Sequence, residues 1–508
     1  MSSKIFSAAT LGLEAQVVEV EADIGGGQGG VFIVVGLPDA AVQEARERVW
    51  SAIKNCELDF PRYKIVVNLA PADLRKEGPA YDLPIALSLI MAAGHLTLNE
   101  IDKEAIYLGE LSLDGRLRPI AGILPIALMA KAKNIPRLYV PLANAPEASL
   151  IDGLEVMPVD NLLELFEHLT GQKNITPFVP APWQEFVPDY SKEIDMAYVK
   201  GQEHAKRALE IAAAGGHNVL LSGPPGSGKT LLARAMTTIL PPLSRDEVLE
   251  VTKIYSVAGK LINGGNLITE RPFRSPHHTA SGVALVGGGA FPRPGEISLA
   301  HKGILFLDEF PEFPRLVLEN LRQPLEDGVV TVSRAQGTIT FPARFTLIAS
   351  QNPCPCGYAS DPERACVCAP GQILKYRKRI SGPLLDRIDL HIEVPRLKFD
   401  KLNSAELSES SENIRGRIVP ARERQHLRFK GTKISTNAEM TAKEIKDICL
   451  LDGQTQELMH NAVEQLHLSG RGYHRILKVA RTIADLAGEE NIALAHVAEA
   501  LQYRAKVE

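Results

Sequence analysis

A glycine-rich loop that ends in lysine and threonine carries the clearest chemistry in this sequence. It lies between an apolar run ending at Leu221 and a helical pattern over residues 231–236, and its residues are Gly223, Pro224, Pro225, Gly226, Ser227, Gly228, Lys229 and Thr230. Glycines at these positions let backbone N–H groups surround phosphate oxygens at the N-terminus of a helix. Lys229 would then reach the β- and γ-phosphates, and Thr230 would bind Mg²⁺. The pattern predicts that the chain binds ATP together with Mg²⁺.

Two adjacent carboxylates, Asp308 and Glu309, close an apolar run over residues 304–307 that is typical of a buried strand. In phosphoryl transfer, Asp308 would bind the magnesium shell and Glu309 would orient or deprotonate the attacking water. The alternative interpretation is a core strand with a solvated acidic end. A complete phosphate loop upstream favours the catalytic interpretation, and the pair then predicts hydrolysis of the nucleotide rather than its storage.

Three further polar residues follow in the order that ring ATPases use. Asn352 closes the apolar run 344–348 and could orient the attacking water, the role called sensor 1. Arg387 stands beside an apolar strand pattern, where a ring ATPase supplies an arginine finger to the neighbouring subunit. Arg475 lies on a predicted helix near the C-terminus and is the candidate for sensor 2. Each arginine alone is more typical of a surface ion pair, so only their order behind the phosphate loop favours these roles.

Four of the six cysteines lie close together as two C-x-C pairs: Cys354, Cys356, Cys366 and Cys368. Four thiolates suit a closed tetrahedral Zn²⁺ site, although C-x₂-C is the commoner spacing. Such clustering indicates a structural zinc site in a reducing compartment rather than a disulfide framework. Unrelated free thiols are the alternative.

The elements that must position these residues follow from hydrophobic periodicity, which predicts an α/β fold in three domains. Residues 1–171 alternate strands and helices and predict an α+β domain, and residues 172–195 predict a proline-rich linker. Residues 196–395 predict the P-loop ATPase domain, with a zinc knuckle at 354–368. Residues 396–508 have a helical pattern and predict a lid.

Two segments extend the predicted ATPase domain. Residues 255–298 predict an insertion, and residues 329–341 alternate at strand period and predict a hairpin. Arg334 and Arg344 could contact DNA phosphates from this hairpin and from its exit, with an ordinary exposed hairpin as the alternative. A structural loop role is predicted for His277-His278, because adjacent histidines at this spacing rarely share one metal ion.

Composition restricts the partners and the location. A chain of 508 residues, 45% of them apolar and 23% charged, is typical of a globular protein with about two to four domains. No apolar run is long enough to span a bilayer and no signal segment is recognisable, so a cytoplasmic protein without a membrane partner is expected. The net charge of −5 means that any contact with nucleic acid must come from local basic patches.

In their order, these motifs resemble the AAA+ ring ATPases, specifically the magnesium-chelatase-like branch and its ComM/YifB family. The resemblance covers essentially the whole chain, and its specific segments are Gly223–Thr230, Phe273–His278, Leu305–Phe310, Asn352–Gly357 and Gly382–Asp389. It implies a homohexameric ring that hydrolyses ATP to move along single-stranded or branched DNA as a helicase. It also implies a role in branch migration when incoming strands recombine during natural transformation.

Residues 66–142 resemble the Lon protease domain, which implies a ribosomal S5-like fold for the N-terminal domain. Lys76–Ala80 is similar to the nucleophile motif of that domain, and residues 109–123 are similar to the segment before its lysine. The nucleophile position is Ala80 and the lysine position is Ile126, so the Ser–Lys dyad is missing. Peptide cleavage is therefore not expected, and a ring-forming or DNA-contacting role is expected instead.

Three functions compete with a DNA motor. A magnesium-chelatase-like motor would remodel a protein partner while a metal enters a tetrapyrrole, and a chaperone-like motor would remodel other proteins. Both remain open because ring motors use one mechanism on different polymers. An ATP-dependent protease is the third, and Ala80 and Ile126 argue against it. The cysteine pairs and the complete Lon-like domain favour DNA.

Overall fold

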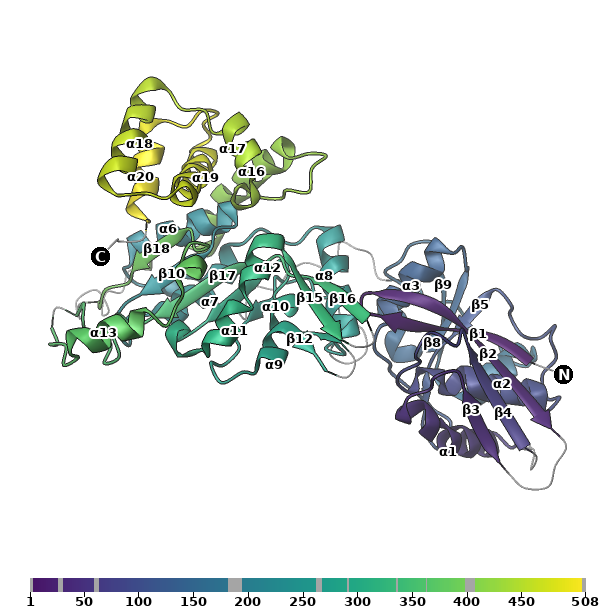
Figure 1. Cartoon of the computed structure of the whole chain (residues 1–508). Coiled ribbons are helices and arrows are strands. Elements are labelled where there is room, and N and C mark those ends of the chain that lie inside the picture. The colour runs from purple at the N-terminus through teal and green to yellow at the C-terminus, as the bar shows by residue number, and fades with distance from the viewer. Residues whose placement is uncertain are drawn as a thin grey trace. The chain divides into compact units, whose positions relative to one another are not determined.

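The computed structural model describes residues 3–25, 31–58, 64–180, 194–261, 267–289, 292–334, 337–361, 363–397 and 407–504. Two compact units make up the chain (Figure 1): unit 1 contains Met1–Val187 and Arg245–Ile268, and unit 2 contains Pro188–Ser244 and Thr269–Glu508. Of the predicted linker 172–195, residues 181–193 lie outside the described part. Within the described part, no helix is both long and apolar enough to cross a bilayer.

Unit 1 contains two larger sheets. The four-stranded sheet has the order β1-β2-β4-β3, with β1 (Ser3–Leu11), β2 (Glu14–Gly25), β4 (Lys64–Ala70) and β3 (Phe32–Val35). The three-stranded parallel sheet has the order β5-β8-β9, with β5 (Ala105–Tyr107), β8 (Arg137–Pro141) and β9 (Glu155–Val159). Strand β2 buries Val18, Val20 and Ala22 while Glu19 and Glu21 stay partly exposed, which is the period-two pattern of a strand with one buried face.

The helices of unit 1 divide between two hydrophobic clusters. They are α1 (Ala40–Asn55), α2 (Asp82–Ala92), α3 (Ile123–Ala132), α4 (Ala145–Ala148) and α5 (Leu162–Leu169), and a small hairpin is formed by β6 (Glu110–Leu111) and β7 (Leu117–Arg118). Helix α2 is buried from Asp82 to Met91, and the carboxylate of Asp82 accepts a hydrogen bond from Arg48 Nε at 2.7 Å. Ile126 belongs to a hydrophobic cluster against which Ala80 packs, so both positions of the missing dyad contribute to packing.

One helix from the middle of the chain belongs to unit 1. Helix α8 (Arg245–Val257) buries an apolar stripe, Val248, Val251 and Ile254, and packs against α3. Ser256 Oγ donates to Glu147 Oε1 at 2.5 Å, which fixes the last turn of the helix. The structure thus differs from the predicted domain boundaries, which assigned this segment to 196–395, because its apolar face is covered by the N-terminal unit.

Unit 2 is built on a five-stranded parallel sheet with the order β11-β14-β17-β10-β18. Its strands are β11 (Phe273–Arg274), β14 (Ile304–Leu307), β17 (Thr346–Gln351), β10 (Val219–Ser222) and β18 (Leu390–Glu393). Every residue of β14 is buried, as expected for a strand covered on both faces. Helices α6 (Glu203–Gly215) and α7 (Lys229–Ile239) belong to the same hydrophobic core. The predicted α/β fold with a P-loop core is confirmed.

Short elements complete the part of unit 2 that contains the five-stranded sheet. They are α9 (Gly282–Val286), β12 (Gly287–Gly288), β13 (Arg293–Pro294), α10 (Glu296–Leu299), α11 (Arg315–Glu319), α12 (Arg322–Asp327), β15 (Val329–Arg334), β16 (Gly337–Pro342), α13 (Pro370–Arg377) and α14 (Gly382–Leu385). Strands β15 and β16 form the predicted hairpin, whose residues 335–336 lie outside the described part.

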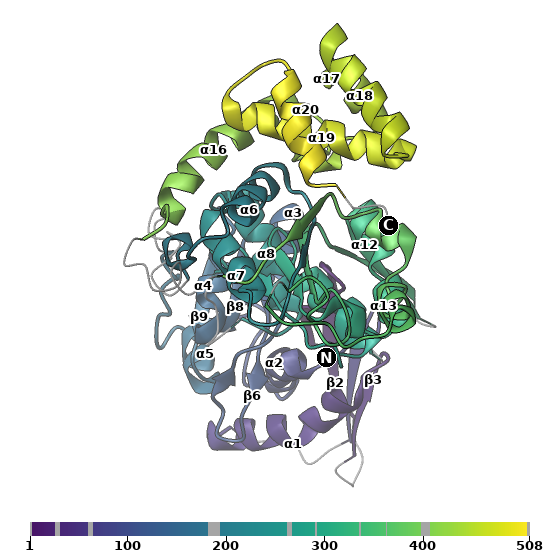
Figure 2. The same cartoon turned by 90° about the vertical axis from the view of Figure 1, so that its left-hand side faces the viewer.

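The C-terminal part of unit 2 is helical, as predicted for the lid. Its helices are α16 (Ser411–Arg428), α17 (Ala442–Ile448), α18 (Gly453–Gln465), α19 (Gly470–Ala487) and α20 (Leu494–Gln502). Helices α17 to α20 lie together in both views (Figures 1 and 2). Helix α19 is the centre of this group, since it packs against α16, α17 and α20 and also against α6 beside the parallel sheet.

Candidate active site

The predicted phosphate loop connects the end of β10 to the first turn of α7. Gly226 and Gly228 have φ angles of +76° and +91°, in the left-handed region that side chains disfavour. A Cβ atom at Gly223 would lie 2.1 Å from the carbonyl oxygen of Val394, so this position has no room for a side chain. The loop therefore has the open backbone that a phosphate cradle requires.

Lys229 is the first residue of α7, and its ammonium group is held by neutral acceptors. Nζ donates to the carbonyl oxygens of Gly223 at 2.7 Å and Pro224 at 2.9 Å, and to Asn352 Oδ1 at 3.3 Å. Burial lowers the pKa of Lys229, and the charge of Asp308 acts in the opposite direction. Ser227 Oγ is buried and, within the part of the chain described, has no hydrogen-bond partner. A buried cation and an unpaired hydroxyl fit the phosphates of a nucleotide.

The predicted magnesium ligands lie next to each other. Thr230 Oγ1 donates to Asp308 Oδ2 at 3.1 Å, and the other carboxylate oxygen accepts from Ser350 Oγ. A hydroxyl and a carboxylate are oxygen ligands of the kind that Mg²⁺ prefers beside substrate phosphates. Ser350 is a site residue that the sequence did not reveal. It lies one position beyond the register partner of Leu307, and only the pairing of β14 with β17 brings it to Asp308.

Glu309, the predicted base, contacts a histidine in the segment that follows β11. Its Oε2 lies 3.2 Å from His278 Nδ1, and its side chain is 53% exposed. The His278 ring also lies against the His277 ring, with centroids 4.1 Å apart and ring planes tilted by 33°. In the part of the chain described, the metal-type ligands that cluster are the four cysteines, and the histidine pair is not among them. The contact of His278 with Glu309 was missed from the sequence.

Asn352 connects this site to the cysteine pairs. Two residues beyond it the predicted zinc knuckle begins, and a Cβ atom at Gly357 would lie 2.6 Å from the Pro225 ring of the phosphate loop. The knuckle therefore lies directly against the loop. Gly357, with φ +86°, is the residue that permits this close approach.

The structure brings the four cysteines together. The Sγ atoms of Cys354, Cys356 and Cys366 lie 3.3–3.6 Å apart, and all four sulfurs lie within 4.8 Å of one another. Tetrahedral Zn–S bonds of about 2.3 Å require sulfurs about 3.8 Å apart, so the arrangement fits zinc. Backbone hydrogen bonds at Tyr358 and Val367 lower the pKa of Cys356 to about 6, which favours its thiolate. At Cys366 and Cys368 a backbone hydrogen bond acts in the same direction, but burial and hydrogen bonds to the neighbouring thiols outweigh it and raise the pKa.

The two predicted regulatory arginines meet at one turn, between α14 and β18. Arg387 is 15% exposed, forms an ion pair with Glu326 and donates to the Pro383 carbonyl at 2.6 Å. Arg475 of the lid donates to the carbonyl of Ile388 at 2.7 Å. Their roles as arginine finger and sensor 2 remain predictions, and their described contacts lie at this turn.

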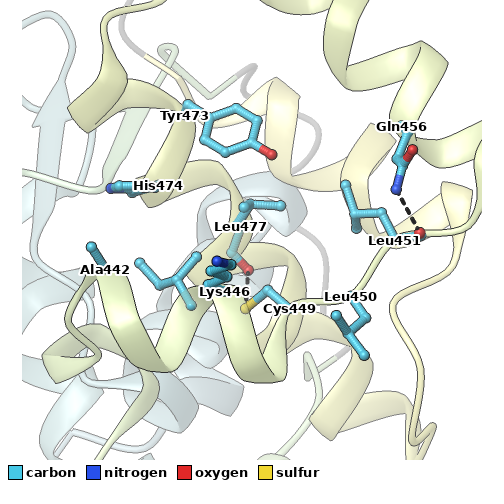
Figure 3. A pocket seen from close by; sticks show the side chains of 10 residues that line it. Ala442, Lys446, Cys449, Leu450, Leu451, Gln456, Tyr473, His474 and Leu477 are labelled. Carbon is cyan, nitrogen blue, oxygen red and sulfur yellow. Dashed lines mark hydrogen bonds between the residues drawn. The ribbon is translucent and has the colours of Figure 1, made fainter.

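The lid also contains a pocket beside α17 and α19 (Figure 3). Tyr473, His474 and Leu477 of α19 line it, and Lys446 of α17 contributes a cation. Cys449 Sγ donates to the Leu477 carbonyl on its floor. No described residue of the phosphate loop lines the pocket, so it is separate from the nucleotide site.

Comparisons with known proteins agree with this geometry. The family models "Subunit ChlI of Mg-chelatase", "Magnesium chelatase, subunit ChlI" and "Magnesium chelatase, subunit ChlI C-terminal" match residues 20–144, 195–402 and 408–504. Competence protein ComM of Haemophilus influenzae is 44% identical over 506 residues, covering 99% of this chain and 97% of that protein. Uncharacterized protein YifB of Escherichia coli is 44% identical over 508 residues, covering 99% and 97%. The magnesium-chelatase 38 kDa subunit of Cereibacter sphaeroides is 26% identical over 178 residues, covering 32% and 53%.

The site makes a first testable prediction. Glu309→Gln is expected to bind ATP normally but to lose about 10²- to 10⁴-fold in turnover, because the attacking water loses its base while the phosphate cradle stays intact. Lys229→Ala is expected to weaken ATP binding itself. Equilibrium binding of a fluorescent ATP analogue and the steady-state ATPase rate separate these two effects.

Glu312→Gln is the matched control, since this nearby carboxylate forms an ion pair with Arg379 and is 42% exposed. It should hydrolyse ATP at the rate of the unmodified chain. Normal turnover in Glu309→Gln would exclude Glu309 as the base.

Proposed function

Because this chain belongs to the ComM/YifB family of magnesium-chelatase-like AAA+ ATPases, we propose that it is a ring-forming motor that couples ATP hydrolysis to movement along DNA. The single observation that carries the ATPase part is the joint arrangement of Lys229, Asn352, Thr230 and Asp308 at one edge of the parallel sheet. The family implies ATP hydrolysis, and this arrangement supplies the groups for it.

Each residue of the site has a part in hydrolysis. On nucleotide binding, phosphate oxygens replace the carbonyl acceptors of Lys229, whose charge then stabilises negative charge on the transferred group. Thr230 and Asp308 would hold Mg²⁺, which would supply positive charge to neutralise the charge that develops on the phosphates. Asn352 orients the water, and Glu309 accepts its proton after leaving His278.

The DNA part of the proposal is supported by a relative and by surface charge. The Haemophilus relative is a competence protein, and 99% of this chain aligns with it. Lys375, Arg377 and Lys378 at the end of α13 are exposed and close to one another in sequence, as expected for phosphate contacts. Arg344, which the sequence predicts to contact DNA together with Arg334, donates to the Lys433 carbonyl at 2.9 Å. The Arg334 side chain lies outside the described part.

We propose a cytoplasmic homohexamer that extends heteroduplex DNA by branch migration during natural transformation. The alternative function is a motor that remodels a protein partner, as a magnesium chelatase or a chaperone would. The three magnesium-chelatase family models favour this alternative. The full-length match to a competence protein favours DNA.

The second prediction tests the polymer on which the motor acts. Single-stranded and forked DNA should each stimulate the ATPase several-fold at low salt, and the stimulation should weaken as salt rises because phosphate contacts release counterions. A variant with Lys375→Gln and Lys378→Gln should lose part of the stimulation and keep its basal rate. Stimulation by an unfolded protein such as casein, with none by DNA at low salt, would favour the remodelling function.

The third prediction tests the zinc knuckle. Protein purified without chelator should contain about one zinc per chain by elemental analysis, and Cys354→Ser combined with Cys366→Ser should remove it. Because Gly357 contacts Pro225, the metal-free variant should also bind ATP more weakly. Cys56→Ala combined with Cys449→Ala is the control and should keep the zinc. Absence of zinc from the unmodified protein would refute the site.

The fourth prediction concerns Arg387, which we propose acts on the neighbouring subunit's nucleotide. Glu326 is 55% exposed, so its ion pair with Arg387 can exchange for a phosphate at little cost. Arg387→Ala should bind ATP nearly normally and hydrolyse it about 10³-fold more slowly.

Mixing Arg387→Ala with Glu309→Gln should restore some activity, because some interfaces then combine an intact Glu309 with an intact Arg387. The control mixes Glu309→Gln with a chain carrying both substitutions, which provides no intact Glu309. If mixed rings form and no activity returns, Arg387 does not act in trans.

A further inference from the structure

The turn that carries Arg387 is hydrogen-bonded to Asn218, next to the central sheet of unit 2. Asn218, directly before β10, donates from Nδ2 to the Arg387 carbonyl at 2.9 Å, and its own carbonyl accepts from Asp389 N at 3.1 Å. Asn218 Oδ1 also accepts from Leu347 N in β17 at 2.8 Å. The backbone from the Arg387 carbonyl to Asp389 is thus tied through Asn218 to strands β10 and β17.

The lid holds the same turn at two points, both from helix α19. Arg475 is the first: its Nη1 donates to the carbonyls of Ile388 and Leu385, and its Nη2 lies 3.4 Å from Asp386 Oδ1. All three acceptors lie within two residues of Arg387. The guanidinium of Arg475 therefore bonds to acceptors of this turn.

The second point runs through a buried histidine. His217 Nδ1 lies 3.0 Å from Asp389 Oδ2, and His217 Nε2 lies 2.8 Å from Thr482 Oγ1 on α19. Burial opposes ionisation of Asp389, but the hydrogen bond and the charge of His217 hold its pKa below the usual range. A Cβ atom at Gly215 would lie 2.3 Å from His217 and 2.5 Å from Thr482 Oγ1. This position therefore has no room for a side chain beside the His217–Thr482 contact.

The two points lie on one face of a rigid helix. Residues 475 and 482 are two helical turns apart, so their side chains project from the same side of α19. The helix is fixed within the lid by the buried carboxylate of Asp485, which pairs with both nitrogens of the Arg428 fork and with Arg481. Asn437 donates to both Thr482 and Asp485 and continues this network.

We propose that helix α19 acts as a two-point clamp that sets the position of Arg387, with Arg475 and the Thr482–His217–Asp389 relay as positioning residues. A movement of the lid then displaces the turn on both sides of Arg387 and changes how well this arginine reaches a neighbouring nucleotide. This inference rests on the proposed trans role of Arg387. It gives Arg475 a role at this turn, whereas sensor 2 would require it at the nucleotide.

The clamp is tested by a double-mutant cycle between Thr482→Val and Arg387→Ala, measured as single-turnover ATP hydrolysis. Thr482→Val keeps the side-chain shape and removes the hydroxyl that His217 contacts. We expect a loss in rate constant of about 10-fold, within the usual range of coupling between sites, with ATP affinity unchanged. In the Arg387→Ala background, Thr482→Val should cause no further loss, since its effect acts through Arg387.

Two variants separate a positioning role from a structural one. Thr482→Ser restores the hydroxyl and should recover the rate. Glu499→Gln breaks a different contact between lid and core, the ion pair with Arg207 at 2.9 Å, and should leave the rate unchanged. Equal losses from Thr482→Val in both backgrounds, or a loss of ATP affinity, would overturn the clamp. If Arg387→Ala alone hydrolyses ATP normally, the trans role itself fails and the clamp fails with it.

Discussion

The parallel order of β14, β17 and β10 is the constraint on which the candidate active site depends. In a parallel sheet the carboxyl ends of neighbouring strands meet at one edge, where ligands bind. Leu307 pairs with Ala349 and Ser222 with Gln351, so the residues that follow these strands converge. The contacts of Asp308 with Ser350 and of Lys229 with Asn352 are direct results of this register.

The motif residues of the site were predictable from the sequence because their spacing is local. The phosphate loop is one continuous turn, and Asp308 and Glu309 are adjacent at the end of a recognisable strand. Ser350 and His278 were not predictable, because each reaches a carboxylate only through the pairing of its strand with β14. A single serine or histidine after a short strand has no spacing pattern that identifies its partner.

Contacts of the helices were not predictable for the same reason, because they depend on segments that are far apart in the sequence. The buried residues of α8 recur at helical spacing, but such spacing does not say which surface covers them. Likewise, the order of motifs identifies Arg475 as an arginine of the lid, while its acceptors lie 87–90 positions earlier in the chain. His217, Asp389 and Thr482 come from three distant segments, and they meet because α19 packs against α6 and β18 pairs with β10.

The placement of α8 in unit 1 has a consequence for how the chain can be divided. Neither unit is encoded by one uninterrupted stretch, because the polypeptide leaves unit 2 before Arg245 and returns after Ile268. A gene fragment starting at residue 188 would include α8 without the surface that covers Val248, Val251 and Ile254. Such a fragment would expose an apolar stripe to water and tend to self-associate. A soluble version of unit 2 alone therefore needs a short polar loop in place of residues 245–268. A cut in the linker alone would leave α8 joined to unit 2 and packed in unit 1.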